Sequence, residues 1–181
     1  MPNARKDNLY FGVAGQYAVM SELLARGYNV ARPDVDVGDD IISVRDRDGE
    51  FTLIQVKAAN ATRSRNAGLR ARYLIREDQI KIVRPFAQLY FAFVIRSENR
   101  WVDFVLLPHE DLRKAYIHQD VSQRVGRLDP KTGKVAISLV RKGEKLYCAG
   151  RDPKDRQDWS EFRNNWDGRW PKVEHRAASA T

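Results

Sequence analysis

Two short runs near the start of the chain, residues 41–44 and 51–56, are rich in hydrophobic, β-branched and aromatic residues. Such short runs are typical of β-strands, in which side chains alternate between the two faces. The residues between the two runs are mostly charged and include Asp48-Gly49, a strong short-range signal for a hairpin. The pattern therefore predicts an antiparallel β-hairpin.

The same period decides which side chains of the predicted hairpin share a face. With a two-residue loop, Asp40 lies opposite Lys57, and Gln55 lies on the same face as both. A four-residue loop keeps this parity, whereas a three-residue loop puts Asp39 in the place of Asp40. We therefore expect a carboxylate, an amide and an ammonium group to lie together on one face of a sheet.

This combination of groups has a chemical use at a phosphate. Asp40, the Gln55 side-chain oxygen and the Val56 backbone carbonyl are hard oxygen donors, the kind that Mg²⁺ or Mn²⁺ prefers. Lys57 can stabilise charge that develops on a phosphate, or orient the attacking water. A structural interpretation stays open, in which Lys57 and Gln55 are the solvent-facing end of a strand and Asp40 belongs to a turn.

The rest of the pattern predicts an α/β domain. Apolar residues at helical spacing cover residues 8–26, and Gly27 stands where a helix C-terminus favours a left-handed residue. Further strands are expected at residues 28–31, 73–75, 89–95 and 101–107, and short helices at residues 77–83 and 108–116. We expect the first helix to pack on a central mixed sheet that contains the hairpin and the strands near residues 73, 89 and 101, with peripheral helices around it.

The C-terminal part of the chain predicts two further features. Residues 135–140 alternate and are expected to pair with residues 145–148 as a hairpin. Residues 155–166 carry Trp159 and Trp166 at helical spacing and are interpreted as an amphipathic helix. The simpler role for its aromatic stripe is to pack on the body of the domain, and a partner-binding surface is the alternative.

Charge and cysteine content narrow the functional classes. The net charge is +8 and the pI is about 9.7, which favours a polyanionic partner. DNA is the expected partner, with RNA as the alternative, and a homodimer is compatible with the sequence. The single Cys148 excludes an internal disulfide and argues against a thiolate zinc site. Without a long apolar run or a signal-peptide pattern, the chain is expected to be cytoplasmic and without a membrane partner.

A basic stretch follows the predicted hairpin. Residues 58–76 hold five arginines and no acidic residue. Arginine suits bidentate contact with phosphate, so we expect a flexible loop that binds a nucleic-acid backbone. The arginines assigned to this role are Arg63, Arg65, Arg70 and Arg72. A loop that is merely solvated is the alternative.

The order of these segments resembles a known family. The run GVAGQYAVMSELLARGYNV at residues 12–30, then Asp40, then LIQVKAAN at residues 53–60, is similar to the restriction-endonuclease-like nucleases of the PD-(D/E)XK superfamily. The chain most resembles small bacterial members with QVK in place of EVK, and Holliday-junction resolvases share this layout. The resemblance covers about residues 8–107 and implies a restriction-endonuclease-like core.

The resemblance also implies roles for particular residues. It assigns metal binding to Asp40 and Gln55 and catalysis to Lys57, and it expects an acidic residue on the first helix. The usual position of that acid holds Gln16, which lies on the apolar face of the helix, while Glu22 lies six residues later on its flank. Both residues are candidates. Glutamine at positions 16 and 55 removes negative charge and should weaken metal binding.

We therefore expect a Mg²⁺- or Mn²⁺-dependent nuclease that hydrolyses phosphodiester bonds in DNA. Two alternatives remain from the sequence: a nucleic-acid-binding module that kept the fold but lost the metal, and a non-catalytic subunit that docks a partner. The expected organisation is one domain over residues 8–170, made of a core up to about residue 118 and a C-terminal elaboration. Residues 1–7 are expected to fray, and residues 171–181 to form a disordered tail.

Overall fold

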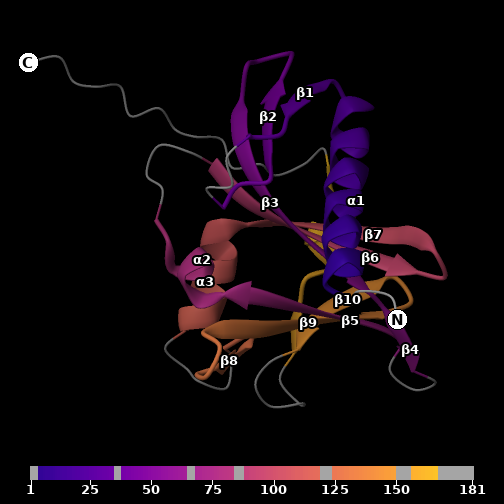
Figure 1. The fold of residues 1–181 in the computed structure, drawn as a ribbon, viewed down its shortest axis with the longest axis vertical. Coiled ribbons are helices and arrows are strands. Elements are labelled where there is room, and N and C mark those ends of the chain that lie inside the picture. Colours follow the sequence, from indigo (N-terminus) through magenta and orange to yellow (C-terminus); the bar gives the residue numbers. More distant parts are fainter. Residues whose placement is uncertain are drawn as a thin grey trace, which may run out of the picture.

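A computed structural model describes residues 4–34, 38–64, 68–83, 88–118, 124–149 and 156–166, with the side chains of residues 4–7 and Ser64 left aside. The chain folds into two β-sheets with one long helix and two short ones (Figure 1). The helical segments are α1 (Ala4–Leu24), α2 (Glu77–Lys81), α3 (His109–Ile117) and a 3₁₀ turn, η2 (Ser160–Phe162). The strands are β1 (Tyr28–Ala31), β2 (Ile41–Arg45), β3 (Phe51–Asn60), β4 (Thr62–Ser64), β5 (Gly68–Arg76), β6 (Gln88–Ser97), β7 (Arg100–Pro108), β8 (Arg127–Asp129), β9 (Lys134–Lys142), β10 (Lys145–Ala149) and β11 (Arg156–Asp158).

The first sheet is the predicted central mixed sheet. Its strand order is β1-β2-β3-β6-β7, with β3 parallel to β6 and every other neighbouring pair antiparallel. A parallel pair needs a crossover connection, and the segment β4-β5-α2 supplies it. The mixed α/β architecture with an N-terminal helix is therefore confirmed.

The strand around Tyr73 does not belong to this sheet, so that part of the prediction is wrong. It is β5, which pairs with β4 and β9 in a second, antiparallel sheet of order β11-β10-β9-β5-β4, with β8 also on β9. The reason is that β5 pairs over its whole length with β9, a strand from the C-terminal part of the chain. The predicted hairpin of residues 135–140 and 145–148 is confirmed as β9 and β10.

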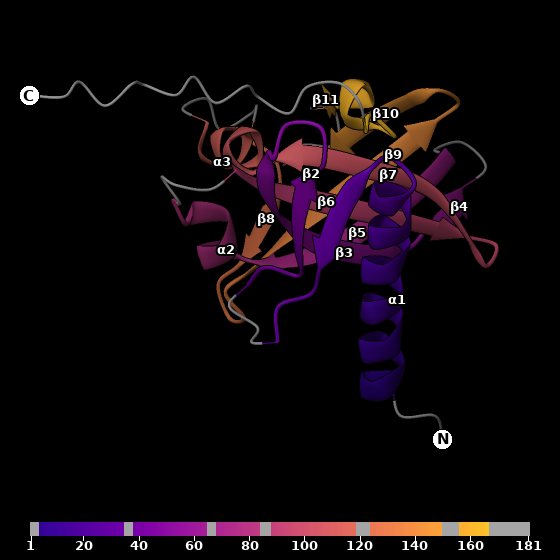
Figure 2. The same ribbon diagram turned by 90° about the horizontal axis from the view of Figure 1, so that it is seen from above.

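Helix α1 packs on one face of the first sheet. Val19 and Leu23 are fully buried against Ile54, Val56 and other alternate residues of the strands below. Figure 2 shows that the first turns of α1 extend beyond the sheets. The helix begins at Ala4, before the predicted start, and ends near the predicted position, where Gly27 has a φ of +79°.

The two sheets pack face to face over a second apolar core. Phe91 and Phe93 from the first sheet meet Tyr73, Ile137 and Leu139 from the second. The Tyr73 hydroxyl donates a hydrogen bond to the Val94 carbonyl at 3.3 Å and so joins the sheets, and burial raises the pKa of this hydroxyl well above its usual value. The molecule therefore has three layers: α1, the first sheet and the second sheet.

The β2–β3 hairpin has a longer loop than predicted. The Arg45 amide donates to the Glu50 carbonyl at 3.0 Å, which leaves a four-residue loop rather than a two-residue turn. Arg45 favours this loop because its guanidinium binds both Asp48 and Glu50. Ile41 consequently pairs with Ile54, and the Asp40 amide also donates to the Ile54 carbonyl, so Asp40 does not lie opposite Lys57 as predicted. For the paired residues of the two strands the predicted parity is kept, because the loop length changes by two.

The predicted helix over residues 155–166 is also wrong. The described part of this segment contains β11 and η2, and the Trp159 amide donates to the Leu146 carbonyl at 2.8 Å. Trp159 is buried in the core between the sheets, whereas Trp166 is buried in the core under α1. One helical face cannot reach both cores, so the chain bends between them. The expected packing of the aromatic residues on the body is correct.

A buried carboxylate ties the two sheets together at one end. Asp103 of β7 is fully buried and accepts hydrogen bonds from Arg141 of β9 at 2.9 Å and from Arg163 at 2.6 Å. Arg163 also donates to the Glu144 carbonyl at 2.9 Å. This arrangement joins β7, β9 and the C-terminal segment through one charge. Among the described residues, no helix is both long and apolar enough to cross a membrane.

Candidate functional site

Asp40 stands at the point where β2 stops pairing with β3. Its amide donates to the Ile54 carbonyl at 3.0 Å, which is the last bond of the ladder. Its carboxylate then reaches beyond the ladder: Oδ2 accepts the Val56 amide at 2.7 Å, and Oδ1 accepts the Gln16 side-chain amide at 2.7 Å. The carboxylate therefore occupies the edge of β3 that β2 leaves uncovered.

Gln16 reaches Asp40 because α1 approaches β3 closely at the preceding residue. A Cβ added to Gly15 would lie 2.7 Å from the Ala58 Cβ, which is closer than atoms can pack. A side chain there would push the helix outward, at a cost of about 1–3 kcal/mol. The prediction that Gln16 points toward the sheet is confirmed. Its Oε1 atom is buried and has no hydrogen-bond partner in the described part of the chain.

Gln55 and Lys57 lie on the other face of β3. Ile54, Val56 and Ala58 face α1, so the residues between them face the second sheet. Gln55 is 4% exposed, and Lys57 is partly exposed. The pairing of β2 with β3 ends at Ile41 and Ile54, and the Asp40 amide also donates to the Ile54 carbonyl, so the alternation of faces does not continue to Asp40. The Asp40 carboxylate meets Gln16 from the side of α1, whereas Gln55 and Lys57 project from the opposite face of β3.

The oxygen atoms gathered at this edge fit a hard divalent cation. The N–H and C=O groups of one residue in a strand point to the same edge, so the Val56 carbonyl faces the side from which its amide binds Asp40. The donor set is then the Asp40 carboxylate, the Val56 carbonyl and the buried Gln16 oxygen, which has no hydrogen-bond partner among the described residues. Of these three donors only Asp40 carries a charge. Within the described ranges, no three Asp, Glu, His or Cys residues come together to hold a metal.

Glu22 is not part of this cluster. Its carboxylate binds the Arg26 guanidinium at 2.6 Å, one turn further along α1. Six residues separate it from Gln16, which corresponds to about 9 Å along the helix axis. Of the two candidates on the first helix, the structure brings only Gln16 to Asp40.

The basic stretch is not a loop beside Asp40, so the prediction of a flexible basic loop is wrong. Its described residues form β4 and β5 of the second sheet, where alternation with buried Ala71 sends Arg70 and Arg72 to the outer face. Arg63 instead lies 3.3 Å from Glu98. Arg65 lies outside the described residues. The contribution of these arginines to DNA binding stays a prediction. Arg70 and Arg72, however, lie on the outer face of the second sheet and not in a loop beside Asp40.

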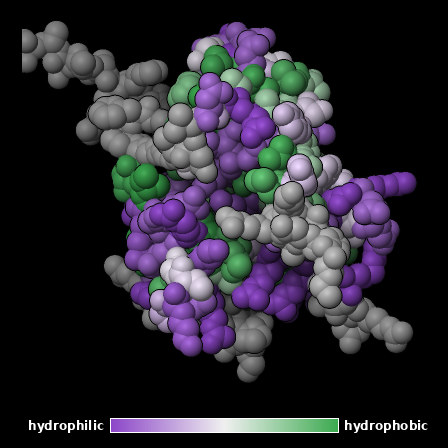
Figure 3. All heavy atoms as spheres, viewed as in Figure 1, coloured by the Kyte–Doolittle hydropathy of each residue, from purple (hydrophilic) through white to green (hydrophobic). Residues whose placement is uncertain are grey.

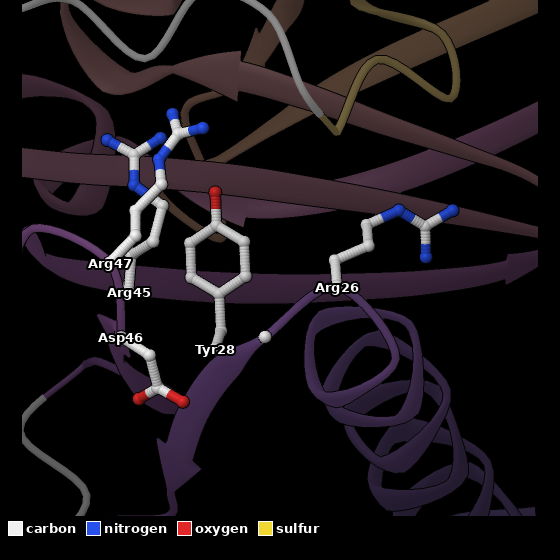
Figure 4. Close-up of a pocket in the computed structure, with 6 residues that line it drawn as sticks. Arg26, Tyr28, Arg45, Asp46 and Arg47 are labelled. Atoms are coloured by element: carbon white, nitrogen blue, oxygen red, sulfur yellow. The ribbon is translucent and has the colours of Figure 1, made fainter.

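A hollow of about 360 Å³ lies beside the hairpin loop and contains three arginines (Figure 4). In Figure 4, Arg45 and Arg47 extend in the same direction as the Tyr28 hydroxyl, and Asp46 points the other way. Arg26 binds Glu22, while Arg45 binds Asp48 and Glu50. Since carboxylates already neutralise these guanidinium groups, the hollow does not have the charge of an anion site.

The sequence did not indicate that the Val56 amide binds Asp40, because a backbone N–H donor cannot be identified from the type of side chain. Sequence patterns also missed the importance of Gly15. A signal for it was present: Gly15 precedes Gln16 on the apolar face of the helix, where glycine lowers helix stability unless close packing requires it.

The described residues form a two-sheet α/β fold in which a carboxylate, held by a side-chain amide and a backbone amide, lies at the edge of β3 beyond the end of β2. Among solved structures, the chain is similar to a bacterial homing endonuclease, I-Ssp6803I, with 18% identity, a TM-score of 0.45 and 86% of each chain covered. It is also similar to Hjc, a Holliday junction resolvase from the archaeal hyperthermophile Archaeoglobus fulgidus, with 14% identity, a TM-score of 0.42 and coverage of 70% of this chain and 82% of that one. No protein family and no curated protein matches the sequence.

Proposed function

We propose that the chain is a metal-dependent nuclease that hydrolyses phosphodiester bonds in DNA, with its site at Asp40. The observation that carries the proposal is the position of the Asp40 carboxylate, fixed by Gln16 and the Val56 amide at the edge where β2 ends. A carboxylate held by two donors at an open strand edge is presented to a ligand in one orientation. Such preorganisation is what catalysis at a charged centre requires.

Asp40, the Val56 carbonyl and the Gln16 and Gln55 amide oxygens would hold Mg²⁺ or Mn²⁺. When bound, the ion supplies Lewis-acid stabilisation of the phosphate and lowers the pKa of a water molecule. Lys57 projects from the face opposite α1, and its ammonium group stabilises negative charge on the phosphate oxygens. The Gln16 amide keeps the Asp40 carboxylate oriented. The net charge of +8 favours association with the DNA backbone.

A second function is favoured by one specific observation. Among the described residues the cluster holds one carboxylate, that of Asp40, because glutamine occupies positions 16 and 55. A cation held by one charged ligand binds more weakly than one held by two or three. A DNA-binding module, or a non-catalytic subunit, with a degenerate metal site is therefore the second candidate.

The direct test is cleavage of DNA by the purified protein with Mg²⁺, with Mn²⁺ and with EDTA, together with calorimetric titration of each metal. We expect the protein to bind both Mg²⁺ and Mn²⁺ and to cleave DNA with either ion, but not to cleave it in EDTA. Gln55→Glu adds an anionic oxygen and should tighten metal binding, since hard cations prefer charged oxygen ligands. If neither the wild type nor Gln55→Glu binds metal, the degenerate module is the correct function.

A second test uses the stability of Gln16→Glu. Without metal, the new carboxylate faces Asp40 at the position where an amide donates at 2.7 Å, so like charges should lower the melting temperature. A divalent cation between the two carboxylates removes this repulsion. We therefore expect Mn²⁺ to raise the melting temperature of Gln16→Glu more than that of the wild type.

Glu22→Gln is the matched control for this measurement. It changes a carboxylate on the same helix that binds Arg26 instead of Asp40, so Mn²⁺ should affect it as it affects the wild type. A melting temperature of Gln16→Glu that does not respond to Mn²⁺ would remove the metal site from the proposal.

A further inference from the structure

The outer face of the second sheet carries, besides Arg76, which binds Asp78, four basic residues that the site at Asp40 does not use. Alternate residues of β5 and β9, such as Tyr73 and Ile137, point inward to the core, so the residues between them point outward. We call the basic set on this side the outer basic face. It consists of Arg70 and Arg72 on β5, Lys134 on β9 and Arg127 on β8, all of them exposed.

The strand register brings these side chains together. Arg72 lies opposite Ser138, and Arg127 lies opposite Ala136, two residues away on β9. Since directly opposite residues share a face, the two arginines flank β9 from both sides. Lys134 continues the same row along β9. Basic residues from three strands therefore border one strip of sheet.

None of the four forms an ion pair with a residue in the described segments. Most of the other arginines in the described segments do: Arg45 binds Asp48 and Glu50, for example. The acidic residue beside the patch, Asp129, turns its carboxylate to the Lys131 amide and the Thr132 hydroxyl, each at 3.0 Å, and closes a turn. The outer basic face therefore presents unneutralised positive charge, which attracts a polyanion.

The shape of this surface also suits a phosphate backbone. The outward residues in the middle of β9 are small, Ala136 and Ser138, so the strand forms the floor of a shallow trough. A hollow of about 490 Å³ lies there, lined by Arg72, Arg127 and Lys134 among others. Figure 3 shows that hydrophilic residues predominate toward the bottom of the view, where Figure 1 places β5, β8 and β9.

We propose that the outer basic face binds the phosphate backbone of DNA, at a site separate from the one at Asp40. The second sheet lies on the side of the first sheet away from α1, so its outer face points away from the Gln16–Asp40 contact. Guanidinium groups bind phosphate oxygens in bidentate fashion, and contacts of this kind do not depend on base sequence. The choice of DNA as the polyanion rests on the proposed function.

The test compares two variants of equal net charge. The outer-face variant combines Arg70→Gln, Arg72→Gln, Arg127→Gln and Lys134→Gln. The control variant combines Arg47→Gln, Lys81→Gln, Arg100→Gln and Lys114→Gln, four exposed basic residues away from this trough. Each variant has four fewer positive charges than the wild type, so a difference between them reports position and not net charge.

Binding to a fluorescein-labelled 30-base-pair DNA duplex is measured in EDTA at several salt concentrations. If all four side chains neutralise phosphates, the slope of log affinity against log salt becomes shallower by about 3.6 in the outer-face variant, or about 0.9 for each phosphate that is no longer neutralised. The control variant should change the slope by less than about 1. Equal slopes in the two variants would overturn the inference.

Failure of this inference is distinguishable from failure of the proposed function. The Asp40→Asn protein should keep the wild-type salt slope, because its substitution lies in another layer of the fold, while it loses cleavage. A wild-type protein that binds the duplex through the outer basic face but never cleaves DNA leaves this inference standing and removes the nuclease. If the protein cleaves DNA but the two variants have equal salt slopes, the proposed nuclease stands and this inference is overturned.

Discussion

Replacing Asp40 with Asn is expected to lower the rate of DNA cleavage about a hundredfold or more and to leave the fold intact. The asparagine oxygen can still accept the Val56 amide, and its NH₂ group can donate to the Gln16 Oε1 atom, which has no hydrogen-bond partner among the described residues. Both hydrogen bonds are therefore kept and only the charge is lost. Loss of the anionic ligand removes stabilisation that a metal site needs in the transition state.

The measurement is the single-turnover cleavage rate of a labelled duplex in Mn²⁺, with circular dichroism as the check on folding. Lys57→Ala should lower the rate by a similar factor, because it removes the positive charge proposed to stabilise the phosphate. Asp39→Asn is the control for register, since Asp39 alternates with Asp40 and is buried at 6% exposure. We expect it to keep most of the activity. Full activity in Asp40→Asn and Lys57→Ala would show that the chemistry takes place elsewhere.

Asp103→Ala is expected to destabilise the protein by about 3–5 kcal/mol, the usual cost of removing one partner from a buried ion pair. Arg141 and Arg163 keep side-chain exposures of only 27% and 14%, so their charges remain poorly solvated once the carboxylate is gone. For a chain of this size, the loss corresponds to a melting temperature lower by about 6–20 °C. Thermal unfolding followed by circular dichroism measures it.

Glu110→Ala is the matched control for Asp103. Glu110 binds Arg113 at 2.8 Å on α3, and the Glu110 side chain is 48% exposed, against 0% for Asp103. An exposed pair of this kind contributes about 0–1 kcal/mol. If Asp103→Ala and Glu110→Ala melt at the same temperature, the charge at Asp103 does not hold the two sheets together.

The sequence predicted which side chains of the paired hairpin strands share a face, but not which residues pair with each other. The alternation of residues 41–44 and 51–56 fixes which side chains share a face, and loops of two and four residues preserve that assignment. The choice between the two loops depends on how Arg45 binds Asp48 and Glu50, a contact that strand patterns do not encode. The residue opposite Asp40 was therefore not predicted correctly, and the role of Asp40 stays a prediction.

Two other errors have a common physical origin. The arginines after the hairpin and the aromatic residues at 159–166 were interpreted from local spacing alone. In the structure, β5 is a strand because β9 pairs with it, and Trp159 and Trp166 separate because they enter different cores. In both cases the deciding contact comes from a distant part of the chain, and tertiary contacts override local propensity.

The pairing of β5 with β9 also sets the order in which the molecule can form. Partners such as Arg76 and Lys134, or Leu69 and Arg141, lie 58 to 72 residues apart, and long-range pairing of this kind slows folding. At about 5–20 residues per second of synthesis, β5 waits roughly 3–14 s for its partner strand. During that interval a nascent chain carries the whole Asp40 cluster while one hydrogen-bonding edge of β5 lacks its partner strand. A fragment that ends near residue 118 lacks β9 altogether, so this edge of β5 would stay unpaired by β9 and available to another chain.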